Sequence, residues 1–275
     1  MKALIVKTLR RALPGAFPAI ARTWQKWNGL VRYGDPHFPR SFSIEISKFC
    51  NRTCSYCPNS IHETPREHID IGLYHTILKR LREIKWNGVL DFIFYNEPLL
   101  HPDIVGLVRR AKEVVPWCMP RILTNGDPLT HDLAKALIEA GVVSFWVSRH
   151  PPVKPGWDDR MALLQEWFPG VITVTDLMAV QDRQGLMTRA GLVKVEKEYQ
   201  VDDCVAPTSC QHIDIEGNFL LCCNDYHRAH KYGNLKAYPI LTLWRDPTYA
   251  KIRKELRHGV TSLTICQNCI VKQKP

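Results

Sequence analysis

Along most of the chain, segments with the residue pattern of a β-strand alternate with segments that have the pattern of an amphipathic helix. Short runs of β-branched and aromatic residues indicate strands, and the segments between them place apolar residues three and four apart, as in amphipathic helices. The predicted strands span 41–46, 88–96, 120–126, 142–150 and 170–180. The predicted helices span 69–86, 101–115, 130–141 and 158–168. This order predicts an α/β fold with a parallel sheet and right-handed crossovers.

The number of strands limits the kind of sheet. Five strands are clear, and we expect a sixth within residues 186–193. Six strands are too few for a closed eight-stranded barrel, so the sequence predicts an open, partial (β/α)6 TIM-like barrel. From about residue 200 the rhythm changes to a hairpin around Gly217, a short basic helix at 246–259 and a final pair of cysteines.

These changes of pattern divide the chain into three predicted parts. A basic N-terminal segment covers 1–40, the barrel core covers 41–199, and a small C-terminal hairpin-plus-helix module covers 200–275.

Composition and charge favour a globular protein. The chain has 275 residues, of which 45% are hydrophobic, enough for one sizeable core. The net charge is +10, and we interpret the basic N-terminal segment as a solvated helix, because basic charge alone identifies no anionic partner.

The apolar runs of the N-terminal segment are shorter than the ~20 residues of a membrane span, and the segment lacks a signal-peptide pattern. We therefore expect a cytoplasmic protein without a transmembrane segment.

The ten cysteines indicate metal chemistry. Without a signal peptide a disulfide framework is not expected, and clustered thiols in a reducing compartment are first of all metal ligands. Nine of the ten lie in two groups, at 50–57 and 204–269, and Cys118 stands alone. A lone cysteine is usually a small buried residue.

The first group, Cys50, Cys54 and Cys57, has the spacing C-x3-C-x2-C and directly follows the first predicted strand. A structural zinc site needs four protein ligands, whereas three thiolates on a four-iron cluster leave one iron open to an exogenous ligand. Reactive groups of parallel barrels gather where strands end. The missing fourth ligand is therefore the informative feature of this motif.

This motif after a first strand resembles the radical S-adenosylmethionine (SAM) superfamily. The resemblance implies a [4Fe-4S] cluster whose open iron binds SAM, and whose electron cleaves SAM to a 5′-deoxyadenosyl radical that abstracts a substrate hydrogen. Tyr56 matches the family's aromatic residue near the adenine. Residues 94–103, FYNEPLLHPD, resemble the Gly-Gly-Glu-Pro stretch, with Glu97 as the acid beside the SAM ammonium and Tyr95-Asn96 in place of two glycines. Glu97 as a simple helix cap is the alternative.

Other polar residues near strand ends are candidate SAM contacts. Thr124, Asn125 and Ser148 can hydrogen-bond the ribose, and Arg189 can pair with the SAM carboxylate. Asn96 is a further cofactor candidate because it precedes Glu97. His101 and His150 also lie near strand ends, where contact with substrate is one interpretation and an ordinary loop position is the favoured one.

The second cysteine group resembles the Twitch module, the short form of the SPASM domain. That resemblance implies one auxiliary [4Fe-4S] cluster, with Cys204, Cys222, Cys266 and Cys269 as ligands. Cys210 is an alternate ligand, and Cys223 can replace Cys222. A four-thiolate zinc site is the structural alternative.

Together the two groups predict an iron–sulfur enzyme with two [4Fe-4S] clusters and SAM. We expect a two-electron oxidation (dehydrogenation) of a carbohydrate-like or peptide substrate, with flavodoxin or ferredoxin as electron donor. One alternative is a radical SAM epimerase or peptide-modifying enzyme that uses Cys118, Cys210 or Cys223 as hydrogen donor. The other is a zinc- or Fe–S-bearing nucleic-acid-binding module, although no clear nucleic-acid signature is present.

Overall fold

The structure is a computed structural model that describes residues 17–199 and 203–269. Two compact units, Met1–Pro39 and Arg40–Pro275, divide the chain. In the first unit α2 (Phe17–Tyr33) exposes the basic residues Arg22, Lys26 and Arg32. Lys2, Lys7, Arg10 and Arg11 of the predicted basic segment lie outside the described residues. No helix in the described ranges is long and apolar enough to cross a membrane.

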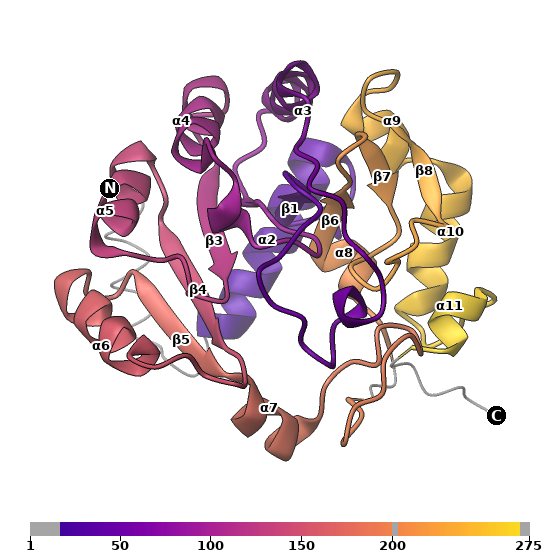
Figure 1. Ribbon diagram of the computed structural model, residues 1–275. Coiled ribbons are helices and arrows are strands. Elements are labelled where there is room, and N and C mark those ends of the chain that lie inside the picture. The colour runs from indigo at the N-terminus through magenta and orange to yellow at the C-terminus, as the bar shows by residue number, and fades with distance from the viewer. Residues whose placement is uncertain (1–16, 200–202, 270–275) are drawn as a thin grey trace. The chain divides into compact units, whose positions relative to one another are not determined.

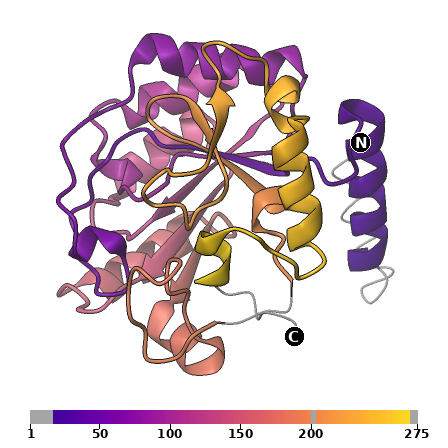
Figure 2. The same ribbon diagram turned by 90° about the vertical axis from the view of Figure 1, so that its right-hand side faces the viewer.

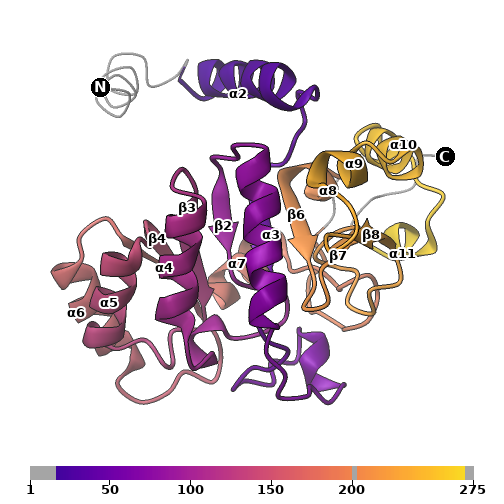
Figure 3. The ribbon, with the colours of Figure 1, turned by 90° about the horizontal axis from the view of Figure 1, so that it is seen from above.

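The second unit is built on an open sheet in the order β5-β4-β3-β2-β1-β6-β7-β8. Its first five strands are mutually parallel, and helices cover their outer face (Figure 1, Figure 3). The strands are β1 (Ser41–Ile44), β2 (Val89–Asp91), β3 (Met119–Thr124), β4 (Ser144–Arg149) and β5 (Ile172–Asp176). The helices are α3 (Ile71–Glu83), α4 (Ile104–Val114), α5 (His131–Ala140) and α6 (Trp157–Trp167). The predicted partial barrel is confirmed.

The connecting helices form where the sequence supplies both caps and an apolar face. Asp70 accepts a hydrogen bond from the Leu73 amide at 2.8 Å and so begins α3. The inward face of α3 buries Leu73, Ile77, Leu78 and Leu81, each contributing about 1.5–3 kcal/mol, and Tyr74, whose hydroxyl donates to the Leu107 carbonyl. Helix α5 begins at Thr130 and ends at Gly141, whose φ of +116° few other residues adopt without strain.

The sixth parallel strand is not where the sequence predicted it. It is β6 (Cys210–Ile213), which pairs with β1 on the side opposite β2. Within 186–193 the structure has a single bridge, between Leu186 and Glu198. Arg189, Ala190 and Gly191 all have positive φ, which breaks an extended strand at that point.

The fifth strand is shorter than its predicted range of 170–180. It ends at Asp176, whose carboxylate accepts hydrogen bonds from the amides of Met178 and Ala179 at 2.8 and 3.2 Å. This side chain caps α7 (Leu177–Gln184), so the second half of the predicted strand is helical.

The C-terminal elements extend the same sheet. Strand β6 turns at Gly217, with φ of +89°, into antiparallel β7 (Asn218–Leu220), the predicted hairpin, and β8 (Lys231–Asn234) follows. The remaining helices are α8 (Ala206–Ser209), α9 (Ile240–Trp244), α10 (Pro247–Leu256) and α11 (Thr264–Gln267). Figure 2 shows α10 and α11 beside β6 to β8. Tyr249 of α10 fixes this packing, because its hydroxyl lies 2.9 Å from Gln211 Oε1 and its ring stacks on Tyr232.

Candidate functional site

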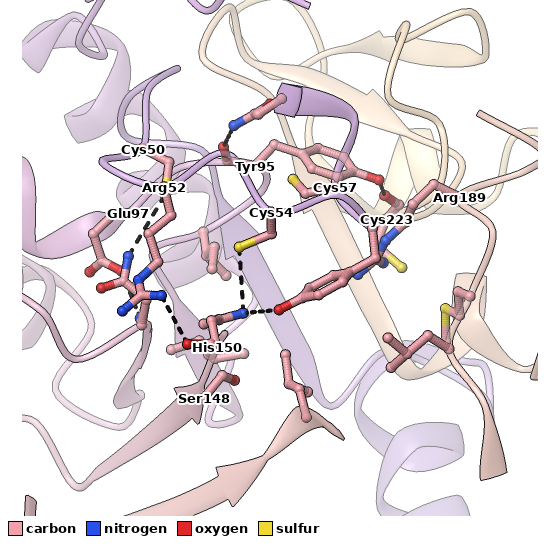
Figure 4. Close-up of a pocket in the computed structure, with 18 of the residues that line it drawn as sticks. Cys50, Arg52, Cys54, Cys57, Tyr95, Glu97, Ser148, His150, Arg189 and Cys223 are labelled. Carbon is pink, nitrogen blue, oxygen red and sulfur yellow. Dashed lines mark hydrogen bonds between the residues drawn. The ribbon is translucent and has the colours of Figure 1, made fainter. Parts of the chain in front are cut away.

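The first three cysteines lie on the loop that follows β1. Cys50, Cys54 and Cys57 all line one cavity of about 530 Å³ at the carboxyl ends of the parallel strands (Figure 4). That volume is typical of a site for a small-molecule cofactor and substrate. Burial raises the pKa of Cys50 to about 11 and also raises the pKa values of Cys54 and Cys57. The thiols therefore hold their protons until a metal displaces them.

A buried ion pair anchors this cysteine loop to the barrel. Arg52 donates from Nε and Nη2 to the two carboxylate oxygens of Asp127 at 2.9 and 2.7 Å. Its Nη1 donates to the carbonyl oxygens of His150 and Pro152. The Arg52 and Asp127 side chains are only 8% and 3% exposed. The loop is thus held against the ends of β3 and β4.

We expect Asp127→Ala to lower the free energy of unfolding by about 2–3 kcal/mol, because Arg52 then stays buried without its carboxylate. Urea unfolding of the anaerobic apoprotein, followed by circular dichroism, measures this loss. Asp158→Ala is the matched control, since it breaks an ion pair between Arg149 and a carboxylate that is 59% exposed. The control should cost less than about 1 kcal/mol. Equal losses in the two variants would contradict a structural role for the Arg52–Asp127 pair.

Glu97, the predicted acid, lies on the loop after β2, which ends at Asp91 and not at the predicted residue 96, and is 2% exposed. Its Oε1 accepts hydrogen bonds from Thr124 Oγ1 at 2.6 Å and from the Leu99 amide at 3.1 Å. Its Oε2 accepts one from the Asn125 amide at 2.8 Å. Burial raises the pKa of Glu97 to about 7, and these hydrogen bonds oppose the rise. Glu97 therefore caps the turn Pro98–Leu100 and also lines the cavity. Its Oε2 accepts one hydrogen bond, so a second lone pair on this atom can accept a hydrogen bond from a cation.

The other predicted SAM contacts line the same cavity: Tyr56, Asn96, Thr124, Asn125, Ser148 and Arg189. Several of them also hold the backbone in place. Asn96 accepts a hydrogen bond from the Phe94 amide and donates one to the Phe92 carbonyl. Asn125 donates to Asn51 Oδ1 at 2.8 Å and so contacts the cysteine loop.

His150 lines the cavity from the loop that directly follows β4. Its Nδ1 lies 2.7 Å from the Tyr56 hydroxyl and 3.7 Å from Cys54 Sγ. Burial and the nearby charge of Arg52 lower the pKa of His150 to about 4, so the imidazole is neutral near pH 7. His101 does not line the cavity; its Nδ1 accepts a hydrogen bond from the Asp103 amide.

Arg189 reaches the cavity from a strained segment. Its φ of +53° and that of Ala190, +58°, lie in the left-handed region, which costs about 1–2 kcal/mol for each residue. The guanidinium lies over the Tyr95 ring, and Nη1 makes a 3.4 Å hydrogen bond to Asn224 Oδ1. Its Nε is inaccessible to solvent and has no hydrogen-bond partner within the described ranges. Figure 4 shows Arg189 beside Cys223.

A second, smaller cavity gathers the C-terminal thiols. It is lined by Cys204, Cys222, Cys223, Cys266 and Cys269, together with apolar side chains such as Leu221 and Leu256. Cys223 is the one cysteine of these five that also lines the large cavity. Neither cavity is lined by Cys210 or by Cys118, which is buried with its thiol 3.8 Å from the Ala111 carbonyl oxygen.

Both thiol sets offer donors that an iron–sulfur cluster can take: Cys50, Cys54 and Cys57 line the large cavity, and five cysteines line the small one.

Three site features gave no signal in the sequence. The Arg52–Asp127 pair joins residues 75 positions apart. Tyr95 donates from its hydroxyl to the Cys223 carbonyl at 2.7 Å, and Asn224 contacts cysteine sulfur atoms. Such contacts depend on which loops the fold brings together, and no local pattern encodes them.

Comparisons with known proteins agree with this site. Residues 44–148 match the family model of the radical SAM superfamily, and residues 204–270 match the SPASM iron-sulfur cluster-binding domain. The S-adenosyl-L-methionine-dependent 2-deoxy-scyllo-inosamine dehydrogenase of Niallia circulans is 29% identical over 231 residues, which cover 82% of this chain and 90% of that protein.

Two solved structures show the same architecture. A crystal structure of BtrN in complex with AdoMet and 2-DOIA superposes with a TM-score of 0.76 and 27% identity, covering 86% of this chain and 97% of that one. SuiB from Streptococcus suis, bound to its precursor peptide SuiA, gives a TM-score of 0.63 with 16% identity, covering 98% and 81% of the two chains. The SuiB likeness concerns the fold alone.

Proposed function

We propose that this chain, which belongs to the radical SAM superfamily and carries a SPASM-type C-terminal module, dehydrogenates an alcohol carbon of a small carbohydrate-like substrate. The observation that carries the proposal is one cavity, lined by three thiols, polar strand ends and aromatic side chains, next to a second set of thiols. The Niallia circulans relative, by its name, oxidises an inosamine. The cavity volume also suits a small cyclic substrate beside SAM.

The cofactors follow from the family: SAM, a SAM-binding four-iron cluster and auxiliary iron–sulfur chemistry in the SPASM module. We propose Cys50, Cys54 and Cys57 as holders of the first cluster. Cys204, Cys222, Cys266 and Cys269 are the proposed holders of the second. When bound, the first cluster and SAM supply a 5′-deoxyadenosyl radical that removes a hydrogen atom from the substrate.

The chain's own residues bind and orient the reactants. Glu97 accepts a hydrogen bond from the SAM ammonium, and Arg189 pairs with the SAM carboxylate. Thr124, Asn125 and Ser148 supply hydrogen bonds to the ribose. The neutral His150 at the cavity wall can accept a hydrogen bond from the hydroxyl group of a substrate alcohol.

Loss of two electrons and two protons from an alcohol gives a carbonyl product. The alcohol carbon would lose a hydrogen atom, and the remaining carbon radical would lose one electron and release its hydroxyl proton to water. Two electrons and two protons would thus leave the substrate. The iron–sulfur group that the C-terminal thiols would hold could take up the second electron. We infer that flavodoxin or ferredoxin supplies the electron that starts the reaction and that the enzyme works in the cytoplasm.

One observation favours an epimerase as the second candidate: Cys223 lines both cavities and can face a substrate radical. An epimerase would return a hydrogen atom from this thiol to the substrate carbon, so solvent deuterium would appear there.

A single experiment separates the two activities. Reconstituted protein receives SAM, dithionite and 2-deoxy-scyllo-inosamine deuterated on its ring carbons, and mass spectrometry follows the deuterium. A dehydrogenase should place deuterium in 5′-deoxyadenosine and form a carbonyl product, and Cys223→Ala should retain that activity. Cys118→Ala is the matched control, because Cys118 lies outside both cavities. Loss of one ring deuterium to solvent protium without formation of a carbonyl, abolished by Cys223→Ala but not by Cys118→Ala, would favour the epimerase, and undeuterated 5′-deoxyadenosine without product would contradict both.

A further inference from the structure

Two thiols of the small cavity, Cys222 and Cys269, share a polar neighbour, Asn224. Its side chain is buried, 4% exposed, and its Nδ2 donates a hydrogen bond to Cys269 Sγ at 3.0 Å. The Asn224 backbone amide donates a second bond, to Cys222 Sγ at 3.4 Å. One residue therefore directs two N–H groups at two of the proposed ligands of the auxiliary cluster.

The orientation of the Asn224 amide is fixed by Arg189. A guanidinium can only donate hydrogen bonds, so the amide oxygen must face Arg189 Nη1, which lies 3.4 Å away. The amide nitrogen is thereby turned toward sulfur, with Cys269 at 3.0 Å and Met187 Sδ at 3.7 Å. The guanidinium itself lies over the Tyr95 ring, 5.9 Å from the ring centroid.

The acceptor of the hydrogen bond from the Asn224 side-chain amide is a sulfur atom, Cys269 Sγ. Neutral sulfur is a weak acceptor, and a buried amide N–H ordinarily pairs with oxygen. An N–H group aimed at a thiolate that carries the charge of a cluster is stabilised more strongly. Hydrogen bonds to cluster sulfur atoms favour the reduced, more negative form and so raise the reduction potential.

We propose that Asn224 is a positioning residue that raises the reduction potential of the auxiliary cluster, with Arg189 holding its amide in the donating orientation. The reduction potential is measured without substrate. A result that contradicts this inference therefore leaves the proposed dehydrogenation untouched, and the reverse also holds. It rests on the SPASM module holding a cluster at the small cavity.

The test compares Asn224→Asp and Asn224→Ala in full-length protein whose Cys50, Cys54 and Cys57 are replaced by Ala, so that the auxiliary cluster alone is observed. Asn224→Asp keeps the shape and removes the N–H donor; Asn224→Ala removes the side chain. Potentiometric titration followed by electron paramagnetic resonance gives the midpoint potential. We expect a shift to more negative potential in both variants, larger for Asn224→Asp because a carboxylate then faces the sulfur.

Asn218→Ala is the matched control. Asn218 is in the same module, and its side-chain amide donates to Asp214 and Glu216 and to no sulfur atom. It should leave the midpoint potential unchanged. Unchanged potentials in both Asn224 variants with normal iron content, or loss of the cluster from both while Asn218→Ala keeps it, would overturn the proposal and make Asn224 a purely structural residue.

Discussion

Replacing Cys50, Cys54 or Cys57 by Ala should abolish the formation of 5′-deoxyadenosine from SAM. Each variant leaves two thiols on the loop after β1, too few to hold a four-iron cluster that already lacks a fourth protein ligand. Iron content should fall from about eight to about four atoms per chain, since the C-terminal thiols are untouched. Iron and sulfide analysis together with chromatography of SAM cleavage products measures both effects.

The control for these variants is Cys118→Ala. Cys118 is buried under α4, away from both cavities, so its loss should cost about 1 kcal/mol of stability and leave iron content unchanged. A triplet variant that still cleaves SAM at the parental rate would show that the radical chemistry does not depend on this loop. Loss of all eight iron atoms would mean that the two cluster sites assemble together.

The parts of the fold that were predictable are those with a local signal. Helix α5 has a Thr cap, an apolar face and a terminal Gly141 within twelve consecutive residues, and the structure places it accordingly. The sixth strand has a local signal only as one arm of the hairpin around Gly217, and this signal does not predict its place beside β1. Cys210–Ile213 has four residues, and its place in the sheet depends on pairing with Ser41–Ile44, far away in the sequence. Short strands paired over a long distance are decided by the sheet.

The candidate site follows the same rule. Closely spaced thiols after a strand, and an acid at the end of the next strand, are visible in the sequence because chemistry fixes their spacing. The sequence did not predict the left-handed backbone at Arg189 and Ala190, because neither Arg nor Ala favours positive φ. Asn224 lies two residues after Cys222 in sequence, but the hydrogen bond from its side-chain amide to Cys269 spans 45 residues. The neighbours of each thiol therefore emerge only from the assembled loops.

Replacing Cys204, Cys222, Cys266 or Cys269 by Ala should have a different effect: SAM is still cleaved, and product no longer forms. The first cluster stays intact on its own loop, whereas the substrate radical loses the acceptor for its second electron. The ratio of carbonyl product to 5′-deoxyadenosine should fall from about one to near zero while iron drops to about four atoms per chain. Parallel quantification of the two products in single-turnover reactions measures the ratio.

The same set of variants assigns the adjacent pair Cys222 and Cys223. Both thiols line the small cavity, and the backbone amide of Asn224 donates to Cys222 Sγ, which is the arrangement expected of a cluster ligand. Cys222→Ala should therefore lose four iron atoms, whereas Cys223→Ala and Cys210→Ala should keep about eight. The reverse pattern within the pair would make Cys223 the ligand, and the cluster would then border the substrate cavity directly. Full product yield after loss of these iron atoms would instead mean that the second electron leaves the substrate by a route independent of the C-terminal module.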